Sequence, residues 1–125
     1  MTRQIVRTDD APQNPAYSQA IKAGGLIFVS GQGPFDAASG AIVGTTIQEQ
    51  TRQCLTNVQA ILESGGSALD RIVSATFILG DPVDFAGMNE EWRRWFPVDP
   101  PARQGAKFPL DVPGLKVSVA VIAEG

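Results

Sequence analysis

Arg103 is the residue of this chain whose type and setting first suggest chemistry. It follows two prolines in the segment "DPPARQGAKFPLDVPGLKVSVAVIA", residues 99–123, whose composition predicts two short apolar strands joined by a Pro/Gly turn. An arginine does not lose its charge, so a partly buried one needs an anion beside it. That anion is either a carboxylate of the protein, for which Asp111 in the turn is the best candidate, or the carboxylate of a ligand.

The chain contains no histidine and a single cysteine, Cys54. The lack of histidine excludes Ser-His-Asp and Cys-His catalysis and removes the commonest ligand of transition metals, so no metal site is expected. Any chemistry must depend on carboxylates, hydroxyls, backbone groups, arginine, lysine or water. A lone cysteine cannot form an internal disulfide, which is typical of the reducing cytoplasm.

Four other polar or small residues lie where a ligand contact is conceivable. Ser30 and Gly31 lie at the expected end of a strand in "FVSGQG", and either let the backbone bend there or contact a ligand. The segment does not match the nucleophile elbow G-x-S-x-G. Tyr17, the only tyrosine, lies in a polar loop, and Asn89 lies beside an apolar helical stripe. An amide at such a place more commonly bonds the backbone of a neighbouring element than a ligand.

The composition is that of one globular domain spanning residues 1–125. The chain is 43% apolar and 18% charged, with a net charge of −3. The acidic balance does not favour nucleic acid as a partner. No apolar run is long enough for a signal peptide or a membrane span, and we find no internal repeat.

Two amphipathic helices are predicted. The first spans residues 46–64, with a capping box of Thr46 and Glu49 at its start and Gly65-Gly66 at its end. The second begins with Asp81 as N-cap and Pro82 at the first helical position, and Pro97 ends it. Its buried stripe is predicted to be Phe85, Met88, Trp92 and Phe96.

The remaining segments predict six strands. Five are expected over residues 3–6, 26–29, 71–79, 102–108 and 115–123, and a further return strand of a hairpin over 41–43.

The expected elements form one sheet with both single-stripe helices on one of its faces. The strand over 71–79 alternates, which predicts an apolar face of Val73, Ala75, Phe77 and Leu79. The opposite face of the sheet also carries apolar or small residues. A small sheet with helices on one side only would expose that face, so we expect a second subunit to cover it.

Five segments that lie within residues 14–123 carry a resemblance to a known family: "AYSQAI" (16–21), "LIFVSGQGPFDAASGAIVG" (26–44), "IQEQTRQCLTNVQAILESGGSALDRIV" (47–73), "DFAGMNEEW" (84–92) and "PPAR" (100–103). Together they resemble the RidA/YjgF/UK114 family, also described as the endoribonuclease L-PSP family. It implies a chorismate-mutase-like α+β fold, a mixed sheet with two helices on one face. It also implies a homotrimer with the sheets turned inward and a cleft at each subunit boundary.

The resemblance also implies an activity without a cofactor. Members of this family hydrolyse reactive enamine and imine intermediates, such as 2-aminoacrylate, to a keto acid and ammonia. By this resemblance, Arg103 of the "PAR" segment holds the substrate carboxylate. Tyr17, Ser30 and Gly31 line the same cleft, and Asn89 of the "MNE" segment belongs to it.

The chain departs from the family pattern at two places. Family deaminases typically end in a strand like "EIEAIA", whose second glutamate is thought to position or activate water, and this chain has "SVAVIA". Ala120 occupies the position of that glutamate, and Ser118 is the remaining group able to bond a water. Gly105 stands where cysteine or alanine is frequent, and we expect the glycine to widen the pocket beside Arg103.

Three functions therefore stay open. The first is an enamine/imine deaminase whose catalytic candidates are Arg103 and Ser118. The second is a trimer that binds small carboxylates without turning them over. The third, a ribonuclease, is weakened by the acidic balance and the lack of histidine.

Overall fold

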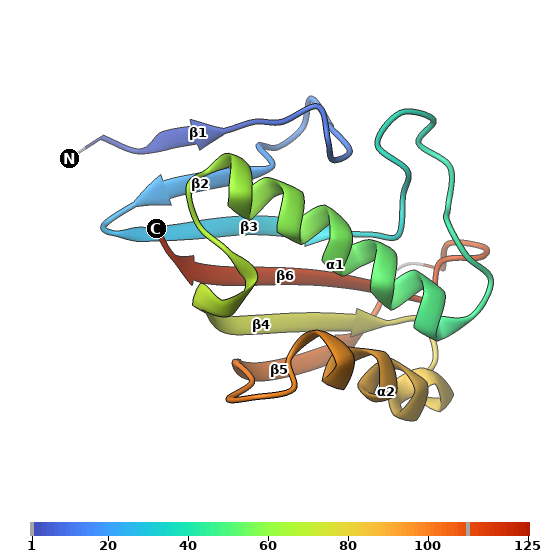
Figure 1. Cartoon of the computed structure of the whole chain (residues 1–125). Helices are drawn as coiled ribbons and strands as arrows, with labels where there is room; N and C mark the ends of the chain where they lie inside the picture. The colour runs from blue at the N-terminus through green and yellow to red at the C-terminus, as the bar shows by residue number, and fades with distance from the viewer. Residues whose placement is uncertain (1, 110) are drawn as a thin grey trace.

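The protein is described here from a computed structural model, which defines the structure of residues 2–109 and 111–125. Six strands form one mixed sheet in the order β1-β2-β3-β6-β4-β5, and both α-helices lie on one side of it (Figure 1). This is the predicted α+β fold with two helices on one face, but β2 was not predicted and lies in a segment expected to be a loop. The elements are β1 (Gln4–Val6), β2 (Ala20–Ala23), β3 (Leu26–Gln32), α1 (Ile47–Ser64), β4 (Ile72–Leu79), α2 (Phe85–Trp95), β5 (Ala102–Lys107) and β6 (Val117–Glu124), with short 3-10 turns at Leu69–Arg71 and Pro82–Asp84.

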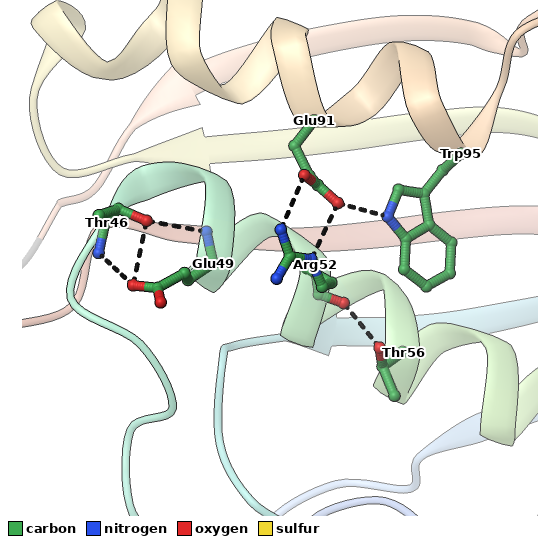
Figure 2. Close-up of polar contacts among 6 residues, drawn as sticks. All are labelled: Thr46, Glu49, Arg52, Thr56, Glu91 and Trp95. Atoms are coloured by element: carbon green, nitrogen blue, oxygen red, sulfur yellow. Dashed lines mark hydrogen bonds and ion pairs between the residues drawn. The ribbon is translucent and has the colours of Figure 1, made fainter.

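Helix α1 begins and ends as its sequence predicts. The Thr46 hydroxyl accepts from the Glu49 amide at 3.1 Å, and the Glu49 carboxylate accepts from the Thr46 amide at 3.1 Å (Figure 2). Gly65 follows the last helical residue, and Gly66 has a φ of +82° that favours glycine. The apolar stripe of α1 is buried over β3 and β6, with the members Cys54, Leu55, Val58, Ile61 and Leu62.

The second helix starts later than predicted. The Asp81 carboxylate accepts from the Val83 amide at 2.9 Å, but it caps a 3-10 turn, and α2 begins only at Phe85. Met88 and Trp92 are buried as predicted, whereas the side chain of Phe85 is 44% exposed. Phe85 is the first residue of the helix, and its ring contacts Phe77 with the ring centroids 5.7 Å apart.

The predicted strand over 41–43 is wrong, and the last two strands are not neighbours in the sheet. Residues 41–43 form no strand, because only one bridge, between Phe35 and Ile42, joins the two sides of that loop. The strands β5 and β6 do not pair across the Pro/Gly turn that separates them in sequence. Strand β4 lies between them, parallel to β5 and antiparallel to β6.

A β-bulge changes which residues of β4 face the helices. The pairing of β4 with β6 is irregular between Ile72 and Ser74, so the alternation shifts by one residue there. Ile72 is therefore buried and Val73 is 45% exposed, so Val73 does not share a face with Ala75, Phe77 and Leu79 as predicted. Ala75, Phe77 and Leu79 are buried on the helix-covered face, as predicted.

The strand register aligns one side chain from each strand in rows across the sheet. The row that matters most for the candidate site lies on the helix-covered face and runs from β1 to β5. Its first five members are buried, and the sixth lies on the edge strand: Val6, Ala20, Val29, Val121, Ala75 and Arg103. The register thus places Arg103 at the edge of the core.

A neighbouring row lies on the face that no helix covers, called the open face below. It consists of Ile5, Ile21, Phe28 and Ile122, one from each of four adjacent strands. Ile5 is 56% exposed and Phe28 is 42% exposed. The open face is thus apolar, as predicted. Within the described residues, no helix is both long and apolar enough to span a membrane.

Candidate functional site

Arg103 is surrounded by aromatic rings. Its guanidinium carbon lies 4.8 Å from the ring centroid of Phe77, 5.1 Å from that of Trp92 and 5.7 Å from that of Phe85. Cations at such distances over ring faces are attracted by the negative potential of the π-system. Partial burial lowers the pKa of Arg103, but an arginine remains charged at neutral pH. We call Phe77, Phe85 and Trp92 the aromatic cradle.

The described residues provide no anion for Arg103. The one ion pair found among residues 2–109 and 111–125 joins Arg52 to Glu91. Asp111, the internal partner considered from the sequence, is exposed and makes no ion pair there. The rings therefore hold the cation while its hydrogen-bond donors remain available, an arrangement suited to a planar carboxylate.

Arg103 lines a hollow of about 300 Å³ between α2 and the segment that leads into β5. Asn89 lines the same hollow, so the structure brings two of the predicted site residues together. Arg93, which sequence analysis did not single out, lines it as well. The full lining, called the basic hollow below, is Asn89, Trp92, Arg93, Phe96, Pro100, Pro101 and Arg103.

A buried carboxylate fixes the helix that carries three of the seven lining residues. Glu91 is 3% exposed and accepts from Arg52 at 3.2 and 3.3 Å and from the Trp95 indole at 2.9 Å (Figure 2). Burial alone would raise the pKa of Glu91, but the bonds from Arg52 and Trp95 and the positive charge of Arg52 together lower it. The ionised carboxylate therefore joins α2 to α1.

Three other predicted residues meet in a second hollow of about 350 Å³. Tyr17, Gly31 and Ser118 line it, together with loop residues that include Asn14 and Phe35. Tyr17 is 53% exposed. A Cβ added at Gly31 would meet nothing within 4 Å, so the backbone there is open to approach. We call this the tyrosine hollow.

Ser30 is used within the fold. Its hydroxyl donates to the Ser18 carbonyl at 2.6 Å, and its amide donates to the Gln19 carbonyl at 2.9 Å. It is not among the residues that line either the basic hollow or the tyrosine hollow. Of the two readings of Ser30 that the sequence left open, these bonds favour the structural one.

Gly105 does not widen the pocket beside Arg103, contrary to prediction. It pairs with Phe77 across the β4–β5 register, and a Cβ at position 105 would overlap the Phe77 ring. The large ring of Phe77 thus fills the space that the glycine leaves. Beyond this ring lies an apolar hollow of about 350 Å³, lined by Phe77, Leu79, Pro82, Phe85, Gly105, Ala106 and Lys107.

The predicted site residues do not form one site within a single chain. Arg103 lies on the helix-covered face at the β5 edge, in register with Ala75. Ser118 and Ala120 lie on the open face, in register with Ile78 and Thr76 of β4. Arg103 and Asn89 thus share one hollow, and Tyr17, Gly31 and Ser118 share another.

Two further findings limit the chemistry. Cys54 is fully buried and burial raises the pKa of its thiol, so it is not a reactive nucleophile. In the described part of the chain, no group of three or more histidine, cysteine, aspartate or glutamate side chains is placed to hold a metal ion.

The aromatic cradle and Arg93 are the features that sequence analysis missed. Phe77 and Trp92 were assigned to the core, and they are indeed buried. The parallel register of β4 and β5 brings Phe77 to Arg103, and the packing of α2 over this edge adds Trp92. For Arg93, the available signal was its spacing of four residues from Asn89, which puts both on one side of a helix.

Comparison with known proteins identifies the family. The family model described as Endoribonuclease L-PSP matches residues 8–125. A RutC family protein of Pyrococcus horikoshii is 42% identical over 114 residues, which cover 88% of this chain and 90% of the relative. A 2-iminobutanoate/2-iminopropanoate deaminase of Capra hircus is 34% identical over 124 residues, 98% of this chain and 90% of the relative. The crystal structure of E. coli TdcF with bound serine superposes with a TM-score of 0.89, at 29% identity and with 98% of each chain covered. The chain therefore belongs to the RidA family, the family of the Endoribonuclease L-PSP model.

Proposed function

We propose that this protein hydrolyses reactive enamine and imine intermediates of the 2-aminoacrylate type to a keto acid and ammonia. Arg103 binds the substrate carboxylate through its planar fork. The observation that carries the proposal is a partly buried guanidinium, held by three rings, with no carboxylate partner among the described residues. The names of two relatives agree: one is an iminobutanoate/iminopropanoate deaminase and another is a Reactive Intermediate Deaminase A of Arabidopsis thaliana.

The reaction needs little from the protein beyond positioning. An enamine becomes an imine by moving one proton to carbon, and water then adds to the imine carbon. Loss of ammonia from the adduct leaves the keto acid, so that imine and water are balanced by keto acid and ammonia. A bound carboxylate fixes the imine carbon relative to water, and this fixation lowers the entropic cost of the attack. The structure of E. coli TdcF holds bound serine, a small molecule that carries a carboxylate.

In this proposal, the complete site is formed by residues from more than one copy of the chain. Arg103 and Asn89 lie in the basic hollow, while Tyr17, Gly31 and Ser118 lie in the tyrosine hollow. A homotrimer that buries the apolar open face would allow the two hollows of neighbouring copies to face each other. The apolar row of Ile5, Ile21, Phe28 and Ile122, in which Ile5 and Phe28 are exposed, supports such burial, because large apolar patches of this kind mark interfaces. Ser118 would then hold the water.

A second function, binding of small carboxylates without turnover, is favoured by one observation. Ala120 stands where the family resemblance expects the water-positioning glutamate, and the tyrosine hollow is lined by no carboxylate, lysine or histidine. A serine hydroxyl is a poor base at neutral pH. The ribonuclease function has no comparable support, since the chain carries a net charge of −3.

The test is turnover of 2-aminoacrylate generated in the assay, with ammonia and pyruvate as the readouts. We expect hydrolysis above the spontaneous rate for the wild type, and loss of this excess in Arg103→Ala. Arg94→Ala is the matched control, because Arg94 is an exposed arginine that lines neither hollow. Binding of 2-oxobutanoate without any excess hydrolysis would support the binding function. Equal rates for the wild type and Arg103→Ala would contradict the role of Arg103.

A further inference from the structure

Arg93 adds a second cation to the basic hollow. Asn89 and Arg93 are four residues apart on α2 and therefore lie on one side of the helix, which faces Pro100 and Pro101. Arg103 lines the hollow from strand β5. Two guanidinium groups thus line a space of about 300 Å³ from two different elements.

The two charges are not balanced by the protein. The hollow is lined by no carboxylate, and the ion pair of the described residues uses Arg52 and Glu91. Neither Arg93 nor Arg103 donates a side-chain hydrogen bond to another described residue. The chain as a whole has more acidic than basic residues, 13 against 10, so two neighbouring cations without an acidic partner are not a consequence of composition. An anion that lies between the two guanidinium groups would be attracted by both.

We propose that the ligand of the basic hollow carries two anionic groups, as a 2-oxo or 2-imino dicarboxylate does. Its α-carboxylate binds Arg103, its distal carboxylate binds Arg93, and the Asn89 amide lies beside both. This inference rests on the proposed function, from which it takes the carboxylate contact of Arg103. Pro100 and Pro101 form a wall with restricted φ and without N–H donors, so the two guanidinium groups provide the charged contacts.

The apolar hollow beyond the aromatic cradle would suit a different class of substrate, one with an apolar side chain in place of a second carboxylate. Phe77, Leu79, Pro82 and Phe85 line it and would suit a branched apolar side chain. Arg103 is not among its lining residues, although Phe77 and Phe85, whose rings contact the guanidinium, are. On this proposal, a ligand bound to Arg103 within the basic hollow directs its side chain toward Arg93.

The experiment compares three probes by calorimetry with the full-length wild-type protein. They are 2-oxobutanoate, the apolar 4-methyl-2-oxopentanoate and the diacid 2-oxoglutarate. We expect 2-oxoglutarate to bind more tightly than 2-oxobutanoate by about 5- to 30-fold, between the effect of an exposed ion pair and that of a charge-assisted hydrogen bond. Its affinity should also fall more steeply with added KCl, because two charges are screened.

Substitution identifies which arginine provides the preference. In Arg93→Gln, the ratio of the two affinities should fall toward one, whereas Arg94→Gln, the neighbouring exposed arginine, should keep the wild-type ratio. Arg93 is itself exposed, and an unchanged melting temperature would show that Arg93→Gln is folded.

The outcomes separate this inference from the proposed function. Arg103-dependent binding of 2-oxobutanoate without a preference for the diacid would overturn the inference alone, as would tightest binding of 4-methyl-2-oxopentanoate. A diacid preference that survives in Arg93→Gln would overturn it too. No binding of any probe to the wild type would overturn both.

Discussion

The Glu91 carboxylate provides a quantitative test of how the fold positions the site. It is buried on α2, one residue from Trp92 of the aromatic cradle, and it accepts three hydrogen bonds from Arg52 and Trp95. In Glu91→Gln the side chain keeps its shape, but its amide group turns two hydrogens toward these donors. Removing one partner of a buried pair costs about 3–5 kcal/mol. Exposed pairs contribute about 0–1 kcal/mol.

The expected loss of unfolding free energy lies between these limits, because only one partner of the pair is buried. The Glu91 side chain is 4% exposed, whereas that of Arg52 is 51% exposed. We expect Glu91→Gln to lower the free energy of unfolding by about 1–3 kcal/mol at neutral pH. The pKa of Glu91 is lowered in the folded protein. Glu91 therefore contributes fully to stability at pH values above the pKa of an unfolded glutamate, about 4.3. This contribution is lost as the pH falls through the lower pKa that Glu91 has in the folded protein.

Urea unfolding of the wild type and Glu91→Gln at pH 6.5 and at pH 3 measures this effect. The difference in free energy of unfolding should be largest at pH 6.5 and should shrink at pH 3. Glu90→Gln is the matched control, since Glu90 is exposed on the same helix, and we expect a change within about 0.5 kcal/mol. The reasoning is refuted by a difference that stays constant with pH, or by an equal loss in Glu90→Gln.

The remaining predictions concern β5, β6 and the open face. Gly105→Ala should destabilise the fold by about 1–3 kcal/mol in urea unfolding, because the added Cβ overlaps the Phe77 ring. Adding Phe77→Leu to this variant should restore part of the lost stability, and a Gly105→Ala variant as stable as the wild type would contradict the packing. Ala120→Glu should raise the rate of 2-aminoacrylate hydrolysis by up to about 100-fold if a placed base is what the chain lacks, and a folded variant without any gain would argue against that. Light scattering at micromolar concentration should give three times the 13.2 kDa of one chain, and a monomer mass would exclude the proposed trimer.

Local sequence signals predicted those parts of the fold that depend on neighbours in the chain. The capping box of Thr46 and Glu49 and the glycines after Ser64 fix α1 through bonds within a few residues. The 3-10 turn after Asp81 escaped prediction, because a Pro at that place is compatible with either kind of helical turn. The bulge at Ile72 was also missed, since it depends on how β4 pairs with β6, 45 or more residues later in the chain.

Candidate site residues could be named from the sequence, but their arrangement could not. Arg103 could be recognised from its charge among prolines and small residues. The parallel pairing that sets Phe77 beside Gly105 joins strands separated by a helix, and no local pattern specifies its register. For the same reason the sequence did not show that Arg103 and Ser118 lie on opposite faces of the sheet.

The central claim is that Arg103 is held by the aromatic cradle so that its fork can receive a ligand carboxylate. Calorimetric titration of 2-oxobutanoate into the wild type and Arg103→Lys tests it most directly. Lysine keeps the charge but cannot form two parallel hydrogen bonds to one carboxylate, so the affinity should fall by about 1.5–3 kcal/mol, roughly 10- to 150-fold. Equal affinity in the wild type and Arg103→Lys, or in Arg103→Ala, would contradict the claim.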